Sequence, residues 1–500
     1  MNLLQKQGFL NTLILYGGVA LGFVNGIFLF QRFLTLEQIG FFQLMITISL
    51  LYAQIASVGI SNIILKYFPY YRSDDKTHGG FATFTALWTI LGFGLFTLLF
   101  YLFREPILNH YSQNKGGALL VKYAYFIMPL SFLTMVYATL ESMASTVFKN
   151  VLSSFLREIG LRLFTLVSVV LLAFTIISYH DFLFIYIVAN VCVSLILLVY
   201  ISKGKHFKLS RISPRLFADK TKFFNYGFYT VLSGSSYVLI QNLDNIMLSL
   251  LTKQSLTFVG VYATFFSIAV VISLPAKALS RTSLQIIAQS WAANDLAKIG
   301  KIYHKTSVVQ MLIGCLLFIG LVANKSFIIM LLHKPEYANF YGVFIVVGVG
   351  FLVDMTGGVN GYIMNFSKYY RLTTVFIVSA VIVCVLLNWA LIPRLGMMGA
   401  AVTYALTVFL LNLAYTVFVK VKFGLQPFGS EHLWILLMSI GCLLIGLYLP
   451  VIKNVYIDVV YRSIIIGIIY TALAYFLKIS ADINAIFDRI LKKKAPGTNV

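Results

Sequence analysis

A carboxylate inside an apolar segment is the first feature of this sequence that could support chemistry. Asp244 lies within the apolar segment 223–251, and a second apolar segment follows a short turn and contains Pro275 and the cations Lys277 and Arg281 at its end. A charged side chain at the centre of a membrane-spanning helix costs about 2.5–3.5 kcal/mol on insertion scales. A chain keeps such a group where it faces a partner, water or a substrate, so this hairpin is the first place to search for a site.

Helical spacing groups further polar residues with this carboxylate. In segment 223–251, Tyr237, Gln241 and Asp244 share one helical face, and Asn245 lies beside it. Asp354 and Asn365 share a face of segment 340–366 in the same way. Asp244 and Asp354 are the only carboxylates that we place well inside the predicted spans. Each is interpreted as an ion-coupling group or as half of a buried structural salt bridge.

A second group of candidates carries positive charge near the ends of apolar segments. They are Arg32, Lys66, Arg162, Lys277 and Arg281, with Asn62 one turn before Lys66. Cations at span ends often extend toward lipid headgroups, and that interpretation stays open beside a role in binding an anionic substrate. Gly18, Gly22 and Asn25 align on the first segment, where small residues favour close helix packing.

The sequence contains no recognisable enzyme motif. There is no P-loop, no GxSxG, no HExxH and no His/Cys cluster, so we expect neither a hydrolytic site nor ATP hydrolysis by this chain. The four cysteines, all within apolar segments, show no metal or redox spacing. We therefore predict a protein that is not an enzyme and holds no metal or organic cofactor.

The elements that must position these residues are membrane-spanning helices. The chain of 500 residues is 60% hydrophobic and 11% charged, with a mean hydropathy of +0.89, which excludes a soluble protein. Apolar stretches of about 20 residues are long enough to cross a bilayer as helices. We predict fourteen spans, with uncertain ends, at 11–33, 39–65, 81–103, 118–140, 159–179, 182–202, 223–251, 258–279, 306–332, 340–366, 372–392, 398–419, 432–451 and 459–477.

The distribution of positive charge predicts the orientation. An even number of spans places both termini on one side, and about three quarters of the 38 Lys and Arg residues then lie on that side. We therefore expect both termini in the cytoplasm, in the cytoplasmic (inner) membrane. The same asymmetry accounts for the net charge of +22 without nucleic acid as a partner.

The basic stretch after the sixth span divides the chain. We predict an N-terminal six-helix bundle at 1–202, a basic cytoplasmic linker at 203–222, a C-terminal six-helix bundle at 223–420, and two further helices with a basic tail at 421–500. A weak internal repeat supports two related halves, because IGFF at 39–42 matches VGVY at 259–262. Membrane transporters often carry such repeats, with the substrate site at their interface.

Several short motifs resemble one family of membrane transporters. They are RFLTLEQIGF at 32–41, QNLDNIML at 241–248 with VGVY at 259–262, and LIPRLGMMGAA at 391–401. With the fourteen-span layout, they resemble the Wzx-type polysaccharide flippases of the multidrug/oligosaccharidyl-lipid/polysaccharide (MOP) exporter superfamily. The resemblance covers nearly the whole chain.

This resemblance implies an all-α membrane protein with two pseudo-symmetric six-helix bundles around a V-shaped cavity, as in multidrug and toxin extrusion (MATE) transporters, plus two C-terminal helices. It implies transfer of an undecaprenyl-diphosphate-linked oligosaccharide from the inner to the outer leaflet by alternating access, for O-antigen, lipopolysaccharide or another surface polysaccharide. The cations listed above would attract the diphosphate, and Asp244 and Asp354 would couple transport to H+ or Na+. Other polysaccharide-assembly membrane proteins are possible partners.

Three alternatives remain open from the sequence. A drug/cation antiporter of the same superfamily usually has twelve spans, and a lipid II flippase would share the fourteen-span layout. A membrane polysaccharide polymerase or ligase belongs to a different class, because it generally needs a large outer loop to hold its acceptor. The predicted outer loops are too short for that function.

Overall fold

The described part of the chain folds into helices that are joined by turns and loops. The computed structural model describes residues 3–75, 77–103, 105, 109, 111, 117–147, 149–203, 208–232, 236–480, 484 and 488, without the side chains of 3–9, 236, 237, 278, 281 and 282. No β-strand occurs within these ranges. The chain divides into two units, Met1–Thr264 with Ile392–Gly396, and Phe265–Leu391 with Met397–Val500.

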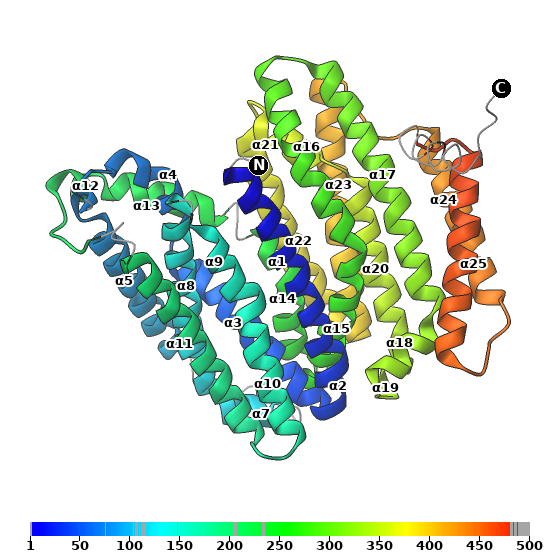
Figure 1. Ribbon diagram of the computed structural model, residues 1–500, viewed down its shortest axis with the longest axis horizontal. Helices are drawn as coiled ribbons and strands as arrows, with labels where there is room; N and C mark the ends of the chain where they lie inside the picture. The colour runs from blue at the N-terminus through cyan, green and yellow to red at the C-terminus, as the bar shows by residue number, and fades with distance from the viewer. Residues whose placement is uncertain are drawn as a thin grey trace, which may run out of the picture. The chain divides into compact units, whose positions relative to one another are not determined.

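The first unit contains the helices coloured blue to green in Figure 1. In chain order its elements are α1 (Leu3–Phe23), η1 (Val24–Leu29), α2 (Phe30–Phe33), α3 (Leu36–Ala56), α4 (Ile60–Tyr71), η2 (His78–Gly80), α5 (Phe81–Leu102), α7 (Ala118–Tyr123), η3 (Ala124–Phe126), α8 (Ile127–Thr146), α9 (Asn150–Phe155), η4 (Leu156–Gly160), α10 (Leu161–Ala173), α11 (Tyr179–Lys203), α12 (Pro214–Ala218), α13 (Lys220–Thr230), α14 (Ser236–Leu251) and α15 (Ser255–Ala269). The elements η1 and η4 are π-helices, and η2 and η3 are 3₁₀ turns.

The second unit begins within α15 and contains the helices coloured green to red that follow it. Its further elements are η6 (Val270–Ser273), α16 (Leu274–Ala292), α17 (Leu296–Ala323), α18 (Lys325–Leu332), α19 (Glu336–Asn339), α20 (Tyr341–Thr356), α21 (Asn360–Phe366), α22 (Tyr370–Leu395), α23 (Met397–Phe423), α24 (Ser430–Tyr448) and α25 (Val455–Phe476). Helix α17 packs against α16, α20, α24 and α25, and α20 packs against α23. The C-terminal helices α24 and α25 lie side by side (Figure 1).

The described residues form eleven helices that are long and apolar enough to cross a membrane. The bent pair α20 and α21, with an angle of 45° at its break, raises the number to twelve. The predicted spans 159–179 and 223–251 are not among them. In the first, α9, η4 and α10 form one helical run that begins at Asn150 and carries Arg157, Glu158 and Arg162. The all-α membrane fold is confirmed, while the number fourteen is not.

The predicted span 39–65 contains a break that hydropathy alone does not reveal. Helix α3 ends at Ala56 and α4 begins at Ile60, with Val58 and Gly59 at positive φ of 45° and 72°. A Cβ on Gly59 would lie 2.5 Å from the carbonyl oxygen of Gly227 in α13. Glycine at this position therefore serves both the left-handed turn and a close backbone crossing.

The two repeated motifs of the sequence meet in the structure. A Cβ on Gly40 of α3 would lie 1.8 Å from the carbonyl oxygen of Leu256 and 3.0 Å from the backbone nitrogen of Gly260 in α15. Reciprocally, a Cβ on Gly260 would lie 2.3 Å from the carbonyl oxygen of Leu36 and 3.1 Å from the nitrogen of Gly40. Gly40 therefore faces Leu256 and Gly260, and Gly260 faces Leu36 and Gly40. This reciprocal contact is the one that a local two-fold axis produces.

Replacing Gly40 by valine is expected to destabilise the first unit strongly. No side-chain rotation relieves this clash, because the neighbouring atoms belong to the backbone of α15. Overpacking of a tight interface costs about 1–3 kcal/mol, and a backbone clash belongs at the upper end of that range. Thermal unfolding of the purified protein in detergent measures the effect.

Gly94→Val is the matched control, since a Cβ at Gly94 meets no atom within 4 Å. Both changes introduce valine for glycine in an apolar helix, so their intrinsic helix costs cancel in the comparison. Equal melting temperatures for the two variants would contradict the contact described here.

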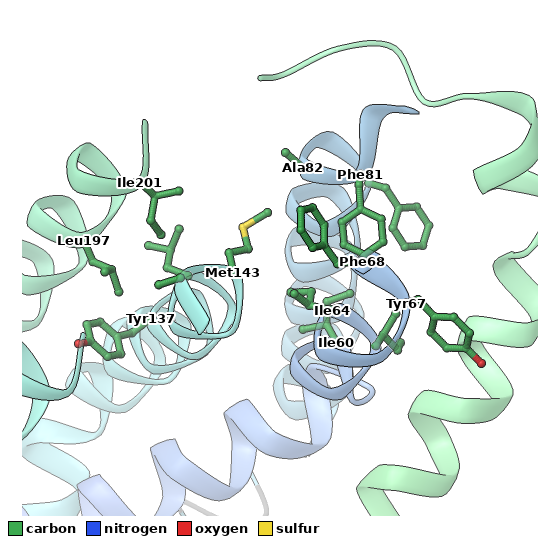
Figure 2. Packing of buried hydrophobic residues seen from close by; sticks show 14 of the residues in the cluster. Ile60, Ile64, Tyr67, Phe68, Phe81, Ala82, Tyr137, Met143, Leu197 and Ile201 are labelled. Atoms are coloured by element: carbon green, nitrogen blue, oxygen red, sulfur yellow. The ribbon is translucent and has the colours of Figure 1, made fainter. Parts of the chain in front are cut away.

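A buried cluster joins the helices of the first unit at one end. It includes Ile60, Ile64 and Phe68 of α4, Phe81 of α5, and side chains of α8, α11 and α13. Figure 2 shows Phe68 and Phe81 side by side, with ring centroids 5.6 Å apart. Helices in lipid gain little from the hydrophobic effect, so close packing of such side chains supplies their association.

The described part of the predicted linker 203–222 is attached to the first unit. The backbone nitrogen of Ser213 donates to the carbonyl oxygen of Gly79 (2.9 Å), and the Thr83 hydroxyl donates to the carbonyl oxygen of Ser210 (2.8 Å). Gly80, at φ 81°, leaves space for the backbone of Arg211, whose carbonyl oxygen would lie 2.4 Å from a Cβ there. Helix α12 follows, capped by the Ser213 hydroxyl. The basic side chains of this segment are presented on a fixed backbone.

A buried ion pair connects α24 and α25 in the second unit. Nε of Arg462 lies 2.8 Å from Oδ2 of Asp458, and both residues are buried. The guanidinium also donates to the carbonyl oxygens of Gly446, Leu449 and Pro450, at 2.5, 2.9 and 3.3 Å. Asp458 accepts from the backbone nitrogen of Ile452 at 2.9 Å. One Arg–Asp pair thus ties the end of α24 and the following turn to α25.

Candidate functional site

A cavity of about 320 Å³ lies within the first unit, among helices that cross the membrane. Helices α3, α4, α8 and α11 and the π-helix η4 contribute its walls. Its polar lining residues are Gln54, Ser57, Ser61, Asn62, Thr134, Tyr137, Arg157, Tyr186 and Asn190. The rest of the lining is glycine and apolar side chains, which is typical of a small-molecule site with a few orienting polar groups.

Arg157 is the charged residue among the described residues that line this cavity. It lies in η4, and its Nη1 is 2.8 Å from Oε2 of Glu141 at the end of α8. The Tyr137 hydroxyl donates to the carbonyl oxygen of Ser153 at 2.6 Å, which fixes α8 to α9, the helix that leads into η4. Short π-helical segments inside α-helices often occur at functional sites, because they change the direction of the side chains that follow.

The hydroxyl groups of the wall satisfy the helix backbone and leave acceptor capacity for a ligand. Thr134 donates to the carbonyl oxygen of Leu130 (2.7 Å) and Ser57 donates to that of Gln54 (2.9 Å). Each hydroxyl oxygen keeps lone pairs after donating its hydrogen. The wall therefore offers hydrogen-bond acceptors to a ligand beside the cation Arg157.

A second ion pair lies next to η4, on the face that meets α1. Nη2 of Arg162 is 3.1 Å from Oε2 of Glu158, and the Asn25 amide donates to the carbonyl oxygen of Arg162 at 2.8 Å. A Cβ on Gly18 would lie 2.7 Å from Nη1 of Arg162, and one on Gly22 would lie 3.4 Å from Cζ. The aligned glycines of the first span therefore make room for a guanidinium, in addition to bringing two helices close.

Asp244 is completely buried in α14. The Tyr262 hydroxyl of α15 donates to its Oδ2 at 2.6 Å. Asn245 follows it, with Nδ2 3.5 Å from the Thr47 hydroxyl and a buried Oδ1 that has no partner within the described structure. Gln241 is half-buried on the same helix. The polar face predicted for this segment thus lies against α3 and α15.

Asp354 lies in the second unit, half-buried in α20. Its Oδ1 accepts from the side-chain amide nitrogen of Asn412 in α23 at 3.1 Å, and the side-chain carbonyl oxygen Oδ1 of Asn412 accepts from the side-chain amide of Asn360 at 2.9 Å. A Cβ on Gly357 would overlap that carbonyl oxygen, at 2.0 Å. The carboxylate therefore belongs to an Asn–Asn–Asp network that joins α20, α21 and α23.

The remaining predicted residues are distributed over both units. Arg32 and Asn62 are exposed in the first unit, and Lys66 places Nζ 3.8 Å from the ring centre of Tyr226. Lys277 and Asn365 are exposed in the second unit. The side chains of Tyr237 and Arg281 lie outside the described part of the structure. Of the twelve predicted residues, Asn62 lines the cavity.

Two further carboxylates that were not candidates lie near the ends of spans, Glu141 in Ala118–Thr146 and Asp458 in Val455–Phe476. Arg157 lies between the predicted spans 118–140 and 159–179 and was not a candidate either. Arg157 and Glu141 are sixteen positions apart in the sequence. That spacing alone does not predict their contact, which depends on how the chain turns between α8 and α9.

The sequence matches the model of the polysaccharide biosynthesis protein family over residues 4–281, more than half of the chain. The chain belongs to the polysaccharide biosynthesis protein family. This membership confirms the resemblance to the polysaccharide-exporter branch that the motifs indicated.

Curated proteins similar to this polysaccharide biosynthesis protein come from archaea. An uncharacterized membrane protein of Methanocaldococcus jannaschii is 22% identical over 459 residues, which cover 87% of this chain and 88% of that protein. The probable low-salt glycan biosynthesis flippase Agl15 of Haloferax volcanii is 24% identical over 230 residues, 44% of this chain and 48% of that protein.

Solved structures show the same fold. The lipid II flippase MurJ in an inward closed conformation has a TM-score of 0.74 at 15% identity, covering 94% of this chain and all of that chain. An inward-facing MATE-family multidrug resistance transporter of the MOP superfamily has a TM-score of 0.65 at 12% identity, covering 82% and 94%. The polysaccharide biosynthesis protein is therefore a multi-pass membrane protein with the MOP exporter fold.

Proposed function

We propose that this protein is a flippase that moves an undecaprenyl-diphosphate-linked oligosaccharide repeat unit from the inner to the outer leaflet for surface polysaccharide assembly. The observation that carries the proposal is the cavity of the first unit, whose lining of polar and apolar groups includes one cation, Arg157. Family membership and the fold support a transporter of lipid-linked glycans. A curated relative named as a glycan biosynthesis flippase and a structural neighbour named as a lipid II flippase point the same way.

The chemistry of the cavity fits such a head group. A guanidinium forms two parallel charge-assisted hydrogen bonds to phosphate oxygens, and these are strong where water is scarce. The hydroxyl and amide groups of the wall would contact the sugar, while the isoprenoid tail remains in the bilayer. Glu141 pairs with Arg157 at 2.8 Å and would release it when the diphosphate binds.

With no nucleotide-binding motif in the sequence, alternating access would be driven by H+ or Na+, with Asp244 and Asp354 as coupling candidates. The protein would act as a transporter, without catalysing a covalent step or holding an organic cofactor. The positive-charge asymmetry supports a cytoplasmic-membrane location with both termini in the cytoplasm, and polysaccharide-assembly proteins of that membrane are candidate partners.

Leaflet transfer in proteoliposomes tests this function directly. The purified protein is expected to transfer an undecaprenyl-diphosphate oligosaccharide between leaflets, measured by accessibility of the sugar to a membrane-impermeant glycosidase. Asp244→Asn is expected to weaken the response to an imposed H+ or Na+ gradient while leaving substrate binding in place. Absence of transfer by the wild type, together with ethidium efflux from cells, would instead favour a drug antiporter.

A further inference from the structure

Two histidines and a glutamate converge where α24 joins the second unit. His304 lies in α17, and Glu431 and His432 open α24. The atoms of these three side chains that could bind a metal ion all lie within 4.8 Å of one another. Neither the predicted site nor the proposed transport function uses them.

The His304 ring is oriented by the loop before α24. Its Nδ1 lies 2.6 Å from the carbonyl oxygen of Pro427. A carbonyl only accepts, so this contact assigns the hydrogen to Nδ1 and leaves the lone pair on Nε2. Nε2 is the atom on the side of the carboxylate, 3.7 Å from Oε1 of Glu431.

The His432 ring is oriented from the bundle. Its Nε2 lies 2.9 Å from the Ser307 hydroxyl, and that hydroxyl donates to the carbonyl oxygen of Thr356 at 2.6 Å. Because the serine hydrogen is already used, Nε2 carries the hydrogen and Nδ1 carries the lone pair. Nδ1 accepts a longer bond of 3.2 Å from the Gly429 nitrogen.

Both imidazoles therefore show the arrangement typical of metal ligands. One ring nitrogen of each donates to a fixed acceptor, which holds the tautomer and leaves the lone pair of the other nitrogen as a potential ligand. Glycine at position 429 leaves room for the Glu431 carboxylate, because a Cβ there would lie 2.4 Å from Oε2 of Glu431 and 3.0 Å from Cε1 of His304. His304 and Glu431 also line a cavity of about 340 Å³, together with Lys305, Lys478 and Ser480, which leaves room for an ion and its water.

We propose that His304, Glu431 and His432 bind a Zn2+ ion. Two imidazole nitrogens and one carboxylate are ligands that zinc accepts, with water completing a tetrahedral shell. Binding replaces the long Gly429–His432 hydrogen bond by a metal bond to Nδ1. The ion would tie the beginning of α24 to α17, and so fix the C-terminal pair of helices to the bundle beside it.

Zinc titration of the full chain tests this site. The protein is purified in detergent with a histidine-free affinity tag, treated with a chelator, and titrated with Zn2+ by calorimetry. We expect one ion per chain for the wild type, and a melting temperature that rises with Zn2+. In His304→Ala and in Glu431→Gln, the affinity is expected to fall at least about tenfold, and the rise should disappear.

His180→Ala is the matched control, because His180 also lies beside a carboxylate, with Nδ1 3.3 Å from Oδ1 of Asp181. It is expected to bind zinc as the wild type does. Metal-free melting curves separate loss of a ligand from misfolding, and Glu431→Gln keeps the shape of the side chain. A wild type that binds no zinc, or a His304→Ala variant that binds it with unchanged affinity, would overturn the proposal.

Discussion

Arg157→Ala is expected to lower oligosaccharide transfer by about 100-fold, more than any other single change in the cavity. A bidentate, charge-assisted guanidinium contact with a phosphate is worth about 2–3 kcal/mol, and each 1.4 kcal/mol corresponds to a factor of ten. Arg157 lies in the π-helix η4 and lines the cavity. The described lining contains no second cation that could replace it. Initial rates of leaflet transfer at several substrate concentrations measure the effect.

Glu141→Gln separates this role from a purely structural one. The glutamine keeps the length of the side chain but loses the charge that competes with phosphate for Arg157, 2.8 Å away. We expect this variant to bind the diphosphate several-fold more tightly and to release it more slowly, so that binding and turnover change in opposite directions.

The double variant Arg157→Ala/Glu141→Gln removes the unpaired carboxylate that the single alanine variant leaves behind. It should remain inactive with wild-type thermal stability, and Arg394→Ala, an exposed cation of α22, should transfer normally. Normal transfer by Arg157→Ala would show that the cavity does not hold the anionic group.

Arg462→Ala is expected to destabilise the α24–α25 hairpin by about 3–5 kcal/mol, the cost of breaking a buried ion pair by removing one partner. The change leaves the buried Asp458 carboxylate without its cation and three carbonyl oxygens without a donor. Thermal unfolding in detergent, followed by a fluorophore attached to α25, reports on this region.

The double variant Asp458→Leu/Arg462→Met distinguishes the charge from the packing. Replacing both members of a buried pair with apolar residues is often neutral, so most of the lost stability should return. Transfer activity of the folded double variant is expected to match the wild type, because neither residue lines the cavity. If Arg462→Ala unfolded like the wild type, the pair would contribute little to the hairpin.

Apolar length predicted most of the spans, because a helix that crosses lipid must satisfy its own backbone over about 20 residues. It failed where the helix is interrupted. Val58 and Gly59 break one predicted span, and the run from Asn150 to Ala173 starts nine residues before its predicted beginning at 159. A hydropathy average places Arg157 in a loop, since it treats a charge as evidence of water even when Glu141 lies beside it.

The candidate site was less accessible to sequence reasoning than the fold. Spacing grouped Gln241, Asp244 and Asn245 on one helix, and the structure places that face against Tyr262 and Thr47. Spacing cannot pair residues of different helices, so Arg162 could not be assigned to the glycines of α1. The repeat at 39–42 and 259–262 can be seen in the sequence. The contact between its two copies follows only from the structure, where α3 and α15 cross.

The Asp458–Arg462 pair also has a consequence for how the chain is made. The two charges are one helical turn apart, and their other partners all lie between Gly446 and Ile452, within the same hairpin. When the last two helices leave the ribosome, they bring their own counter-charge and hydrogen-bond acceptors into the membrane as a neutral unit. Their insertion therefore requires no charged partner from the helices synthesised earlier.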